Sequence, residues 1–307
     1  MAVEAQVKPK APAAAHPLLS SWLQIAGDYI ALLKPRIILL LVVTELSAMF
    51  VAARGWPSPG VLAGSLIGGA MAAGGAGAVN CWFDRDIDKL MPRTRRRAMA
   101  AGRITPAAGL AFGVAVGLGG VALIAFSSNR LAAVLALAGG LVYVFVYTMW
   151  LKRSTAQNIV IGGAAGAFPP LVGWAAVTGS LSPLAWALFA IVFFWTPPHF
   201  WALALLLSRQ YSAAKVPMLP VVAGERRTRL SILFYSVLML GVSAIPILWL
   251  GPIYAVASIA LGAVFLWLAG RASGRRDGAS AMALFHYSLV YLALLFVAAA
   301  VAAAVTL

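Results

Sequence analysis

Residues 61–97 read VLAGSLIGGAMAAGGAGAVNCWFDRDIDKLMPRTRRR, and this stretch joins an apolar run at 61–83 to a dense cluster of charges. A helix needs about 20 predominantly apolar residues to cross a bilayer, so the run is long enough to span one. Small residues dominate it, which permits close packing between helices and predicts that this span lies inside a bundle. The charged cluster that follows then lies where the span leaves the membrane.

The composition extends this prediction to the whole chain. Hydrophobic residues make up 63% of the 307 residues, charged residues 10%, and the mean hydropathy is +0.94. Soluble domains carry roughly 25% charged residues, so the chain is predicted to be an all-α polytopic membrane protein. Nine apolar runs predict nine transmembrane helices around a central cavity; they lie at 37–53, 61–83, 107–127, 131–150, 158–178, 182–206, 229–250, 253–270 and 280–305. A β-barrel is excluded because ten-residue alternating segments are missing.

The distribution of Lys and Arg predicts the orientation. Of 23 basic residues, 21 lie in the N-terminal segment or in every second loop, at 84–106, 151–157, 207–229 and 271–278. This pattern follows the positive-inside rule and places those segments in the cytoplasm, with the C-terminus on the outer side. The formal net charge of +15 therefore reflects membrane topology and not nucleic-acid binding.

The chain is expected to hold one folded unit. Residues 1–18, rich in Ala and Pro, are expected to form a disordered cytoplasmic tail without a signal peptide. Residues 19–307 are expected to form a single transmembrane domain with two long cytoplasmic loops, at 84–106 and 207–229. The single cysteine, Cys81, excludes an intramolecular disulfide.

Three oxygen-bearing side chains follow one another at helical spacing at the end of the second run. Asn80, Asp84 and Asp88 are spaced i, i+4 and i+8 and share a helix face, while Asp86 points roughly 160° away. Oxygen ligands about 6 Å apart suit a hard cation such as Mg²⁺ that itself holds a diphosphate. The alternatives are helix-end polar groups that are solvated at the interface, or salt bridges to Arg85, Lys89 and Arg93.

Cationic and phenolic side chains on the same side are candidates to neutralise a diphosphate. They are Arg93, Arg97, Lys152, Arg153, Tyr211 and Lys215. The positive-inside rule alone accounts for most of the cations. The pair at 211 and 215 is equally explained by an ordinary amphipathic loop helix.

His199 lies in the aromatic run FFWTPPHFW at 193–201, between Trp195 and Trp201. A histidine within a membrane span is more often hydrogen-bonded between helices than bound to a metal. These aromatic neighbours favour a flat, apolar, metal-bearing ligand, and haem iron accepts an imidazole. His286, in the last run, is a second candidate with less context.

Other polar or proline positions inside the runs are also noteworthy. Glu45 is costly there unless it is protonated, paired or lining a wet cavity, and the cavity is the favoured interpretation. The pairs at 169–170 and 197–198 are expected to interrupt their spans, with shaping of a pocket and structural kinks as alternatives.

Together these segments resemble the UbiA superfamily of intramembrane prenyltransferases, and within it the haem-using branch. The superfamily's N-x-x-x-D-x-x-x-D pattern is present at 80–88. Further matching motifs are NIVIGG at 158–163, GAFPPL at 166–171, WTPPHFW at 195–201 and VPMLPVV at 216–222. The resemblance covers about residues 30 to 300, and the WTPPHFW run is specific to the haem-using branch.

The resemblance implies transfer of the farnesyl group of farnesyl diphosphate to a vinyl group of haem B, with hydration, to give haem O for haem-copper oxidases. It implies Mg²⁺ on Asn80, Asp84 and Asp88, with Lys152 assisting catalysis. It also implies the bacterial cytoplasmic (inner) membrane as location and haem A synthase as a partner. The rival interpretations are a prenyltransferase for an aromatic or quinone precursor and, in another class, a transporter or haem channel.

The chain departs from the family pattern in three places. Ala98-Met99 follows Arg97 where the family usually reads Pro-Leu, and Gln210 replaces an acid. Lys215 replaces a small or amide residue, and we hypothesise that it neutralises phosphate directly. A second magnesium ion that depended on the acid at 210 would lack that ligand here.

Overall fold

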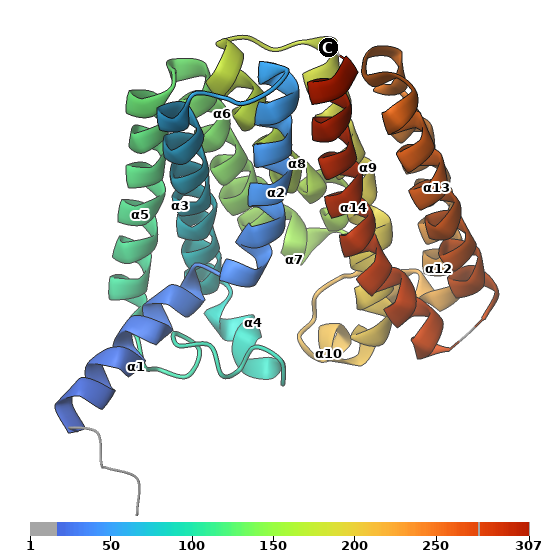
Figure 1. The fold of residues 1–307 in the computed structure, drawn as a ribbon. Coiled ribbons are helices and arrows are strands. Elements are labelled where there is room, and N and C mark those ends of the chain that lie inside the picture. The colour runs from blue at the N-terminus through green and yellow to red at the C-terminus, as the bar shows by residue number, and fades with distance from the viewer. Residues whose placement is uncertain (1–16, 276, 307) are drawn as a thin grey trace, which may run out of the picture.

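The computed structural model describes residues 17–275 and 277–306 and contains only helices and turns within them (Figure 1). The helices are α1 Pro17–Leu32, α2 Pro35–Ala53, α3 Pro59–Phe83, α4 Arg85–Leu90, α5 Pro106–Ser127, α6 Arg130–Leu141, the π-helix η1 Val142–Leu151, α7 Lys152–Ser154, α8 Asn158–Thr178, α9 Pro183–Leu206, α10 Ser208–Ala213, α11 Leu219–Val222, α12 Gly224–Ala244, α13 Ile247–Gly274 and α14 Gly278–Thr306. The all-α prediction is confirmed. Residues 1–16 of the predicted tail lie outside the described residues.

The long helices form one bundle. α3 packs along α5, and α8 lies against α2, α6 and α9. α12, α13 and α14 pack beside one another on the far side of α9, and α14 also contacts α2. The bundle thus places α2, the first long apolar helix, next to the last helix, α14 (Figure 1).

Eight helices of the described residues are long and apolar enough to cross a membrane, one fewer than predicted. The helix that falls outside this set is α12, which begins at Gly224, earlier than the predicted run at 229–250. Its first turns carry Glu225, Arg226, Arg227 and Arg229, so only its later turns are apolar. Since α12 packs against both α9 and α13, it remains a member of the bundle.

Glycine allows α3 and α5 to approach closely. A Cβ atom on Gly75 would lie 2.5 Å from the carbonyl oxygen of Gly113 and 2.5 Å from the Cα atom of Gly117. Gly68 meets the backbone of Gly120 in the same way, with its Cβ 2.7 Å from that carbonyl oxygen. Backbone therefore touches backbone along this pair, as the small residues at 61–83 predict.

The two proline pairs do not interrupt their helices, contrary to the prediction. Pro169 and Pro170 lie inside the continuous helix α8, and Pro197 and Pro198 lie inside α9. Proline removes a backbone donor, but tightly packed neighbours keep such a helix continuous. The irregular segments lie elsewhere. η1 is a π-helix, where hydrogen bonds run from residue i to i+5, and α13 is kinked at Gly251, whose φ of 68° is not helical.

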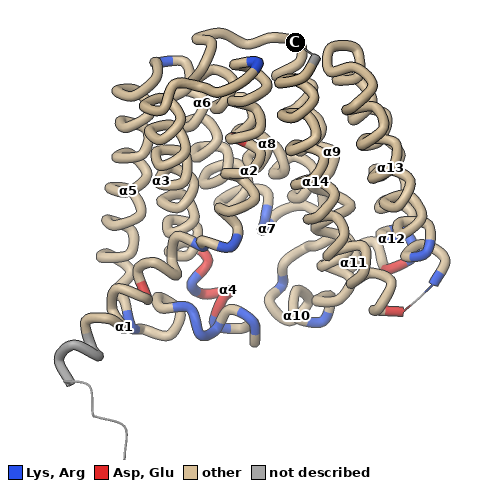
Figure 2. The backbone as a smooth tube through the Cα atoms, viewed as in Figure 1, with Lys and Arg blue, Asp and Glu red and all other residues tan. Residues whose placement is uncertain are grey.

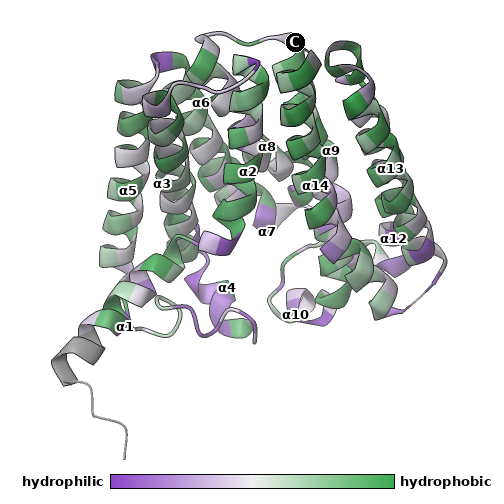
Figure 3. Ribbon diagram, in the orientation of Figure 1, coloured by the Kyte–Doolittle hydropathy of each residue, from purple (hydrophilic) through white to green (hydrophobic). Residues whose placement is uncertain are grey.

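Charged residues concentrate at one end of the bundle, the end that carries α1, α4 and α10 (Figure 2). The same end is hydrophilic in an otherwise hydrophobic bundle (Figure 3). α1 is tied to this end by Arg103, which donates to both oxygens of Asp28 at 2.7 and 2.8 Å. This guanidinium lowers the pKa of Asp28 below its ordinary value. The predicted cytoplasmic loops therefore form one surface.

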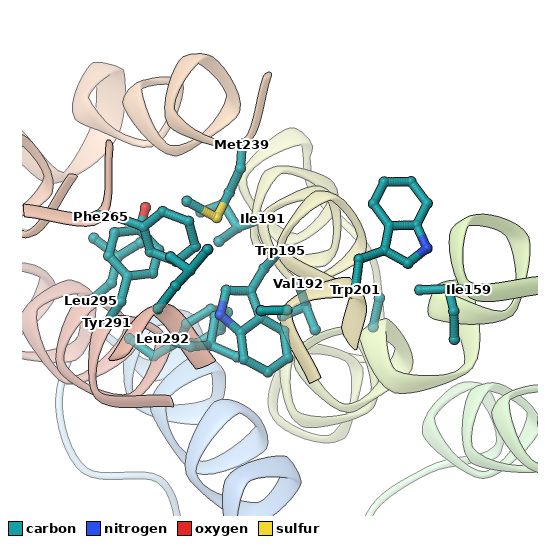
Figure 4. Close-up of a cluster of buried hydrophobic side chains, with 14 of the residues drawn as sticks. Ile159, Ile191, Val192, Trp195, Trp201, Met239, Phe265, Tyr291, Leu292 and Leu295 are labelled. Carbon is teal, nitrogen blue, oxygen red and sulfur yellow. The ribbon is translucent and has the colours of Figure 1, made fainter. Parts of the chain in front are cut away.

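Aromatic side chains fill the core around α9 (Figure 4). Trp195 lies towards Tyr291 and Leu292 of α14, whereas Trp201 lies on the other side of α9, near Ile159 of α8. The two tryptophans of the WTPPHFW run are both buried but occupy different interfaces.

Candidate active site

Asp84 lies at the junction between α3 and α4, and the helical spacing continues through it. Its amide donates to the carbonyl of Asn80 at 2.9 Å, and the amide of Asp88 donates to the carbonyl of Asp84 at 2.8 Å. All three side chains are buried, at 3% exposed or less. Asp86 is exposed, as the predicted helical face requires.

The two oxygens of Asp84 have different surroundings. Oδ2 accepts from Asn80 Nδ2 at 2.7 Å and from the ammonium of Lys152. Oδ1 has no hydrogen-bond partner among the described residues, although the guanidinium nitrogen Nη2 of Arg153 lies 3.7 Å away. Asp84 is 0% exposed, so this oxygen is a buried, unsatisfied acceptor, which is rare and requires an explanation.

Asp88 is held by the arginine loop, the segment after α4 that carries Arg93, Arg95, Arg96 and Arg97. Arg97 Nη1 donates to both of its carboxylate oxygens, at 2.9 and 2.8 Å. Each of the two buried carboxylates is therefore paired with a cation from elsewhere in the chain, Arg97 from the loop after α4 and Lys152 from α7.

Arg153 pairs mainly with Asp86, which points away from the buried carboxylates. It donates to both oxygens of Asp86 at 2.8 Å and lowers the pKa of that carboxyl to about 2. Its predicted contact with a diphosphate therefore competes with Asp86, and this carboxylate is ionised at every pH at which the protein is handled.

Lys34 belongs to the site, although the motif analysis did not single it out. It lies between α1 and α2, and its Nζ atom donates to Asn80 Oδ1 at 2.6 Å and to the Tyr143 hydroxyl at 3.3 Å. Its φ of 58° is left-handed, a conformation that costs a non-glycine residue about 1–2 kcal/mol. The signal in the sequence was a lysine directly before Pro35, at the start of a span.

The π-helix η1 supplies two contacts to this cluster and leads directly into a third. Tyr143 meets Lys34, Thr148 Oγ1 accepts from Asn80 Nδ2 at 3.0 Å, and Lys152 directly follows η1. The hydroxyl of Thr148 donates to the Tyr143 carbonyl at 2.8 Å. In an α-helix, positions 143 and 148 would lie about 140° apart. The wider π turn brings them to the same side.

The second long loop approaches the arginine loop through Tyr211. Burial raises the pKa of this phenol, and the guanidinium groups of Arg93 and Arg97 oppose that shift. Gln210 Oε1 is buried without a partner among the described residues. Lys215 is exposed with a left-handed φ of 55°, so the structure does not bring it together with the buried carboxylates.

His199 is buried between α9 and α14. Its ring stacks on Trp195 and Phe285, with centroids 4.3 and 4.8 Å away, and Nδ1 lies 2.6 Å from Ser288 Oγ. Trp201 points away from this cluster, and its indole nitrogen has no partner within the described chain. His286 is exposed on α14. Of the four predicted haem contacts, only His199 and Trp195 lie together.

Glu45 is buried within α2 and accepts a hydrogen bond from Ser65 Oγ at 2.7 Å. Gly69 of α3 packs directly against its carboxylate. Glu45 is therefore paired in a tight contact between helices, and the wet cavity favoured from the sequence is not what surrounds it.

The donor set fits Mg²⁺ better than a softer metal. The described residues contain no cluster of three or more His, Cys, Asp or Glu side chains. Mg²⁺ is commonly held by one or two carboxylates together with substrate phosphates and water. Asp84 and Asp88 provide two carboxylates, and the unsatisfied Asp84 Oδ1 provides a buried acceptor.

Two pockets lie at opposite ends of the bundle. One of about 370 Å³ is lined by Trp82, Phe83, Arg85, Asp86, Lys89 and Arg153. The other, of about 340 Å³, lies near Arg54 and Trp249 at the end without the acidic motif. Neither is lined by Asp84 or His199, so the predicted central cavity stays a prediction.

The helices form a membrane-spanning bundle, and one end of it holds two buried carboxylates that are paired with Arg97 and Lys152. This arrangement defines an integral membrane protein with a polar site at one end of the bundle. The chain belongs to the UbiA prenyltransferase family, whose match covers residues 41–295. This confirms the resemblance inferred from the motifs.

The chain covers different shares of curated relatives that carry one name. The protoheme IX farnesyltransferase of Roseiflexus sp. (strain RS-1) is 50% identical over 288 residues, which are 92% of this chain and 54% of that protein. The protoheme IX farnesyltransferase of Gloeobacter violaceus (strain ATCC 29082 / PCC 7421) is 50% identical over 278 residues, covering 89% of this chain and 90% of that protein. The chain therefore spans about half the length of some curated relatives and about nine-tenths of others.

The fold is also similar to that of a solved UbiA homologue. The structure of a UbiA homologue from Archaeoglobus fulgidus bound to GPP and Mg²⁺ has a TM-score of 0.68 and 18% sequence identity, covering 88% of this chain and 99% of that one. At this identity the similarity establishes the fold.

Proposed function

We propose that this protein transfers the farnesyl group of farnesyl diphosphate to a vinyl group of haem B, with addition of water, to form haem O. The observation that carries the proposal is the unpartnered, fully buried Asp84 Oδ1, next to a second buried carboxylate and a basic shell. Relatives about 50% identical over nine-tenths of their length are named protoheme IX farnesyltransferase, which supports this acceptor and this prenyl chain.

The side chains of the site supply what loss of a diphosphate requires. Asp84 and Asp88 would hold Mg²⁺, which withdraws negative charge from the leaving group. Lys152, Arg97 and Arg93 would stabilise the departing diphosphate by charge-assisted hydrogen bonds. The apolar helices around the site exclude water, so the allylic cation meets the vinyl group before it is hydrolysed. No strong base is needed first.

The tautomer of His199 suits contact with haem iron. Ser288 has one hydroxyl proton and donates it to the Phe285 carbonyl at 2.6 Å. Its oxygen must therefore accept from His199 Nδ1, which leaves Nε2 with a free lone pair. A metal-bound histidine is usually fixed in this way through its other nitrogen.

The topology proposal follows the charge distribution. The end with α1, α4 and α10 faces the cytoplasm in a bacterial cytoplasmic membrane, and the C-terminus lies on the periplasmic side. Farnesyl diphosphate then arrives from the cytoplasm and haem B from the bilayer. An enzyme that oxidises haem O further, such as haem A synthase, would take the product.

Purified chain, Mg²⁺, farnesyl diphosphate and haem B, followed by mass spectrometry of the extracted haem, test the function. We expect a haem product that has gained a hydrated C15 chain. Transfer to a phenol or quinone precursor with haem unchanged would identify the sibling activity. Absence of turnover with every prenyl diphosphate would favour a transporter or haem channel.

His199→Ala is expected to weaken haem B binding about 10-fold or more, because it removes the imidazole whose Nε2 is available. The measurement is a spectrophotometric haem titration, with a thermal unfolding scan to verify folding. His286→Ala is the matched control, since that side chain is exposed on α14, and it is expected to bind haem as wild type does. The reverse pattern would assign the haem contact to His286.

A further inference from the structure

We propose that Lys34 is a positioning residue that fixes the orientation of the Asn80 side-chain amide. In that orientation Asn80 donates to Asp84 and is not itself a metal ligand. Asp84 Oδ1 is then the oxygen that faces a divalent cation. The inference rests on the metal-dependent part of the proposed function and assigns roles within it that the sequence motif does not distinguish.

The hydrogen bonds allow one orientation of this amide. A lysine ammonium carries donors only, so the Asn80 atom 2.6 Å from Lys34 Nζ is the oxygen. The amide nitrogen therefore faces Asp84 Oδ2 at 2.7 Å and Thr148 Oγ1 at 3.0 Å. Thr148 already donates its only proton to the Tyr143 carbonyl, so it can only accept from Asn80. Both partners on that side require the nitrogen.

This orientation leaves Asp84 with one free oxygen. Oδ2 accepts from Asn80 and from Lys152, whereas Oδ1 has no hydrogen bond with any described residue. Asn80 Oδ1, the atom that would have to ligate a metal, is engaged by the ammonium. The predicted set of three ligands is thereby reduced to the two carboxylates, and only Asp84 has an oxygen without a hydrogen bond among the described residues, since Arg97 donates to both oxygens of Asp88.

Lys34 is built into this position. Its left-handed φ of 58° forms the corner between α1 and α2, just before Pro35. Its Cδ atom lies 3.5 Å from where a Cβ atom of Gly77 would be, so the side chain runs along the glycine face of α3. Strained, closely packed residues of this kind are found where local geometry is functional.

Lys34 could instead serve only as a positive charge that attracts the diphosphate. The two roles predict opposite changes in metal affinity when Lys34 is replaced by an uncharged residue. Removing a positive charge near a cation site strengthens cation binding. Losing a residue that orients the ligands weakens it, typically 10–100-fold. The sign of the change therefore separates the two roles.

The test measures Mn²⁺ binding to the full chain by electron paramagnetic resonance, in the absence of farnesyl diphosphate and haem. Lys34→Met is expected to weaken Mn²⁺ binding about 10-fold, and Lys34→Arg, which still donates to Asn80, to stay within about 3-fold of wild type. Lys89→Met is the matched control, since it removes the same charge from an exposed position beside Asp88 and is expected to leave the affinity unchanged or slightly tighter.

Equal or tighter Mn²⁺ binding by Lys34→Met would overturn the inference. If that variant does not fold, Thr148→Val decides, because it removes an acceptor of the Asn80 amide nitrogen without changing any charge. We expect it to weaken Mn²⁺ binding about 10-fold, and unchanged binding would overturn the inference. Absence of Mn²⁺ binding by the wild type would contradict the metal part of the proposed function itself.

Discussion

Asp84→Asn is expected to lower the rate of prenyl transfer at least about 1,000-fold, equivalent to about 4 kcal/mol of barrier. The substitution keeps the shape of the side chain and an oxygen acceptor but removes the negative charge that a divalent cation requires. It also removes the counter-charge of Lys152, which is paired with Asp84 in the structure. The measurement is the single-turnover rate of haem product formation at saturating farnesyl diphosphate.

Asp86→Asn is the matched control for that result. Its side chain is 62% exposed and pairs with Arg153, whose guanidinium lies 3.7 Å from Asp84 Oδ1 without a hydrogen bond to it, so activity is expected to stay within about 3-fold of wild type. The low pKa of Asp86 means that the pair stabilises the fold above the ordinary value of 3.8 and loses this effect as the pH falls through about 2. The activity of Asp86→Asn relative to wild type should therefore be the same from pH 5 to 8. Equal losses in both variants would mean that the two faces of α4 are not functionally distinct.

Gly75→Ala is expected to destabilise the protein by about 3 kcal/mol, because its methyl group would overlap the backbone of α5. The two helices can relieve the overlap only by separating, and α3 carries Asn80 and leads into Asp84, so activity should fall as well. The measurement is thermal unfolding in detergent with a thiol-reactive dye. The single cysteine, Cys81, is buried in α3, so dye reaction reports opening of that helix.

Gly270→Ala in α13 is the control for that substitution. No heavy atom lies within 4 Å of a Cβ at this position, so the unfolding midpoint is expected to stay the same or rise. For Gly75→Ala we expect a fall of about 5 °C or more. An unchanged midpoint would show that α3 and α5 separate at little cost.

Features that depend on local periodicity were predictable from the sequence. The spans follow from apolar run length, and the opposite directions of Asp84 and Asp86 follow from helical geometry alone. The same rule also shows one weakness of the haem-site prediction. Trp201 lies two residues after His199, about 200° around the helix, so adjacency in the sequence places the two side chains on opposite sides of α9.

Contacts between distant segments were not predictable in this way. Nothing in the spacing indicates that Arg97 pairs with Asp88 or that Lys152 pairs with Asp84, because the chain must fold before these partners meet. The same holds for Lys34, which is 46 residues from Asn80. The charged start of α12 is visible in the sequence, but the apolar residues that follow it, at 229–250, are numerous enough to predict a full span.

The π-helical segment before Lys152 has a consequence for how this protein tolerates change. Each residue of an ordinary helix advances the direction of the next side chain by about 100°. The π-helix at Val142–Leu151 turns less per residue than an α-helix, and it thereby sets the direction in which Lys152, whose ammonium contacts Asp84, leaves the helix. A deletion of one residue there would leave the hydropathy of the span almost untouched, yet it would rotate Lys152 out of alignment. Length in this segment is therefore under a tighter constraint than composition.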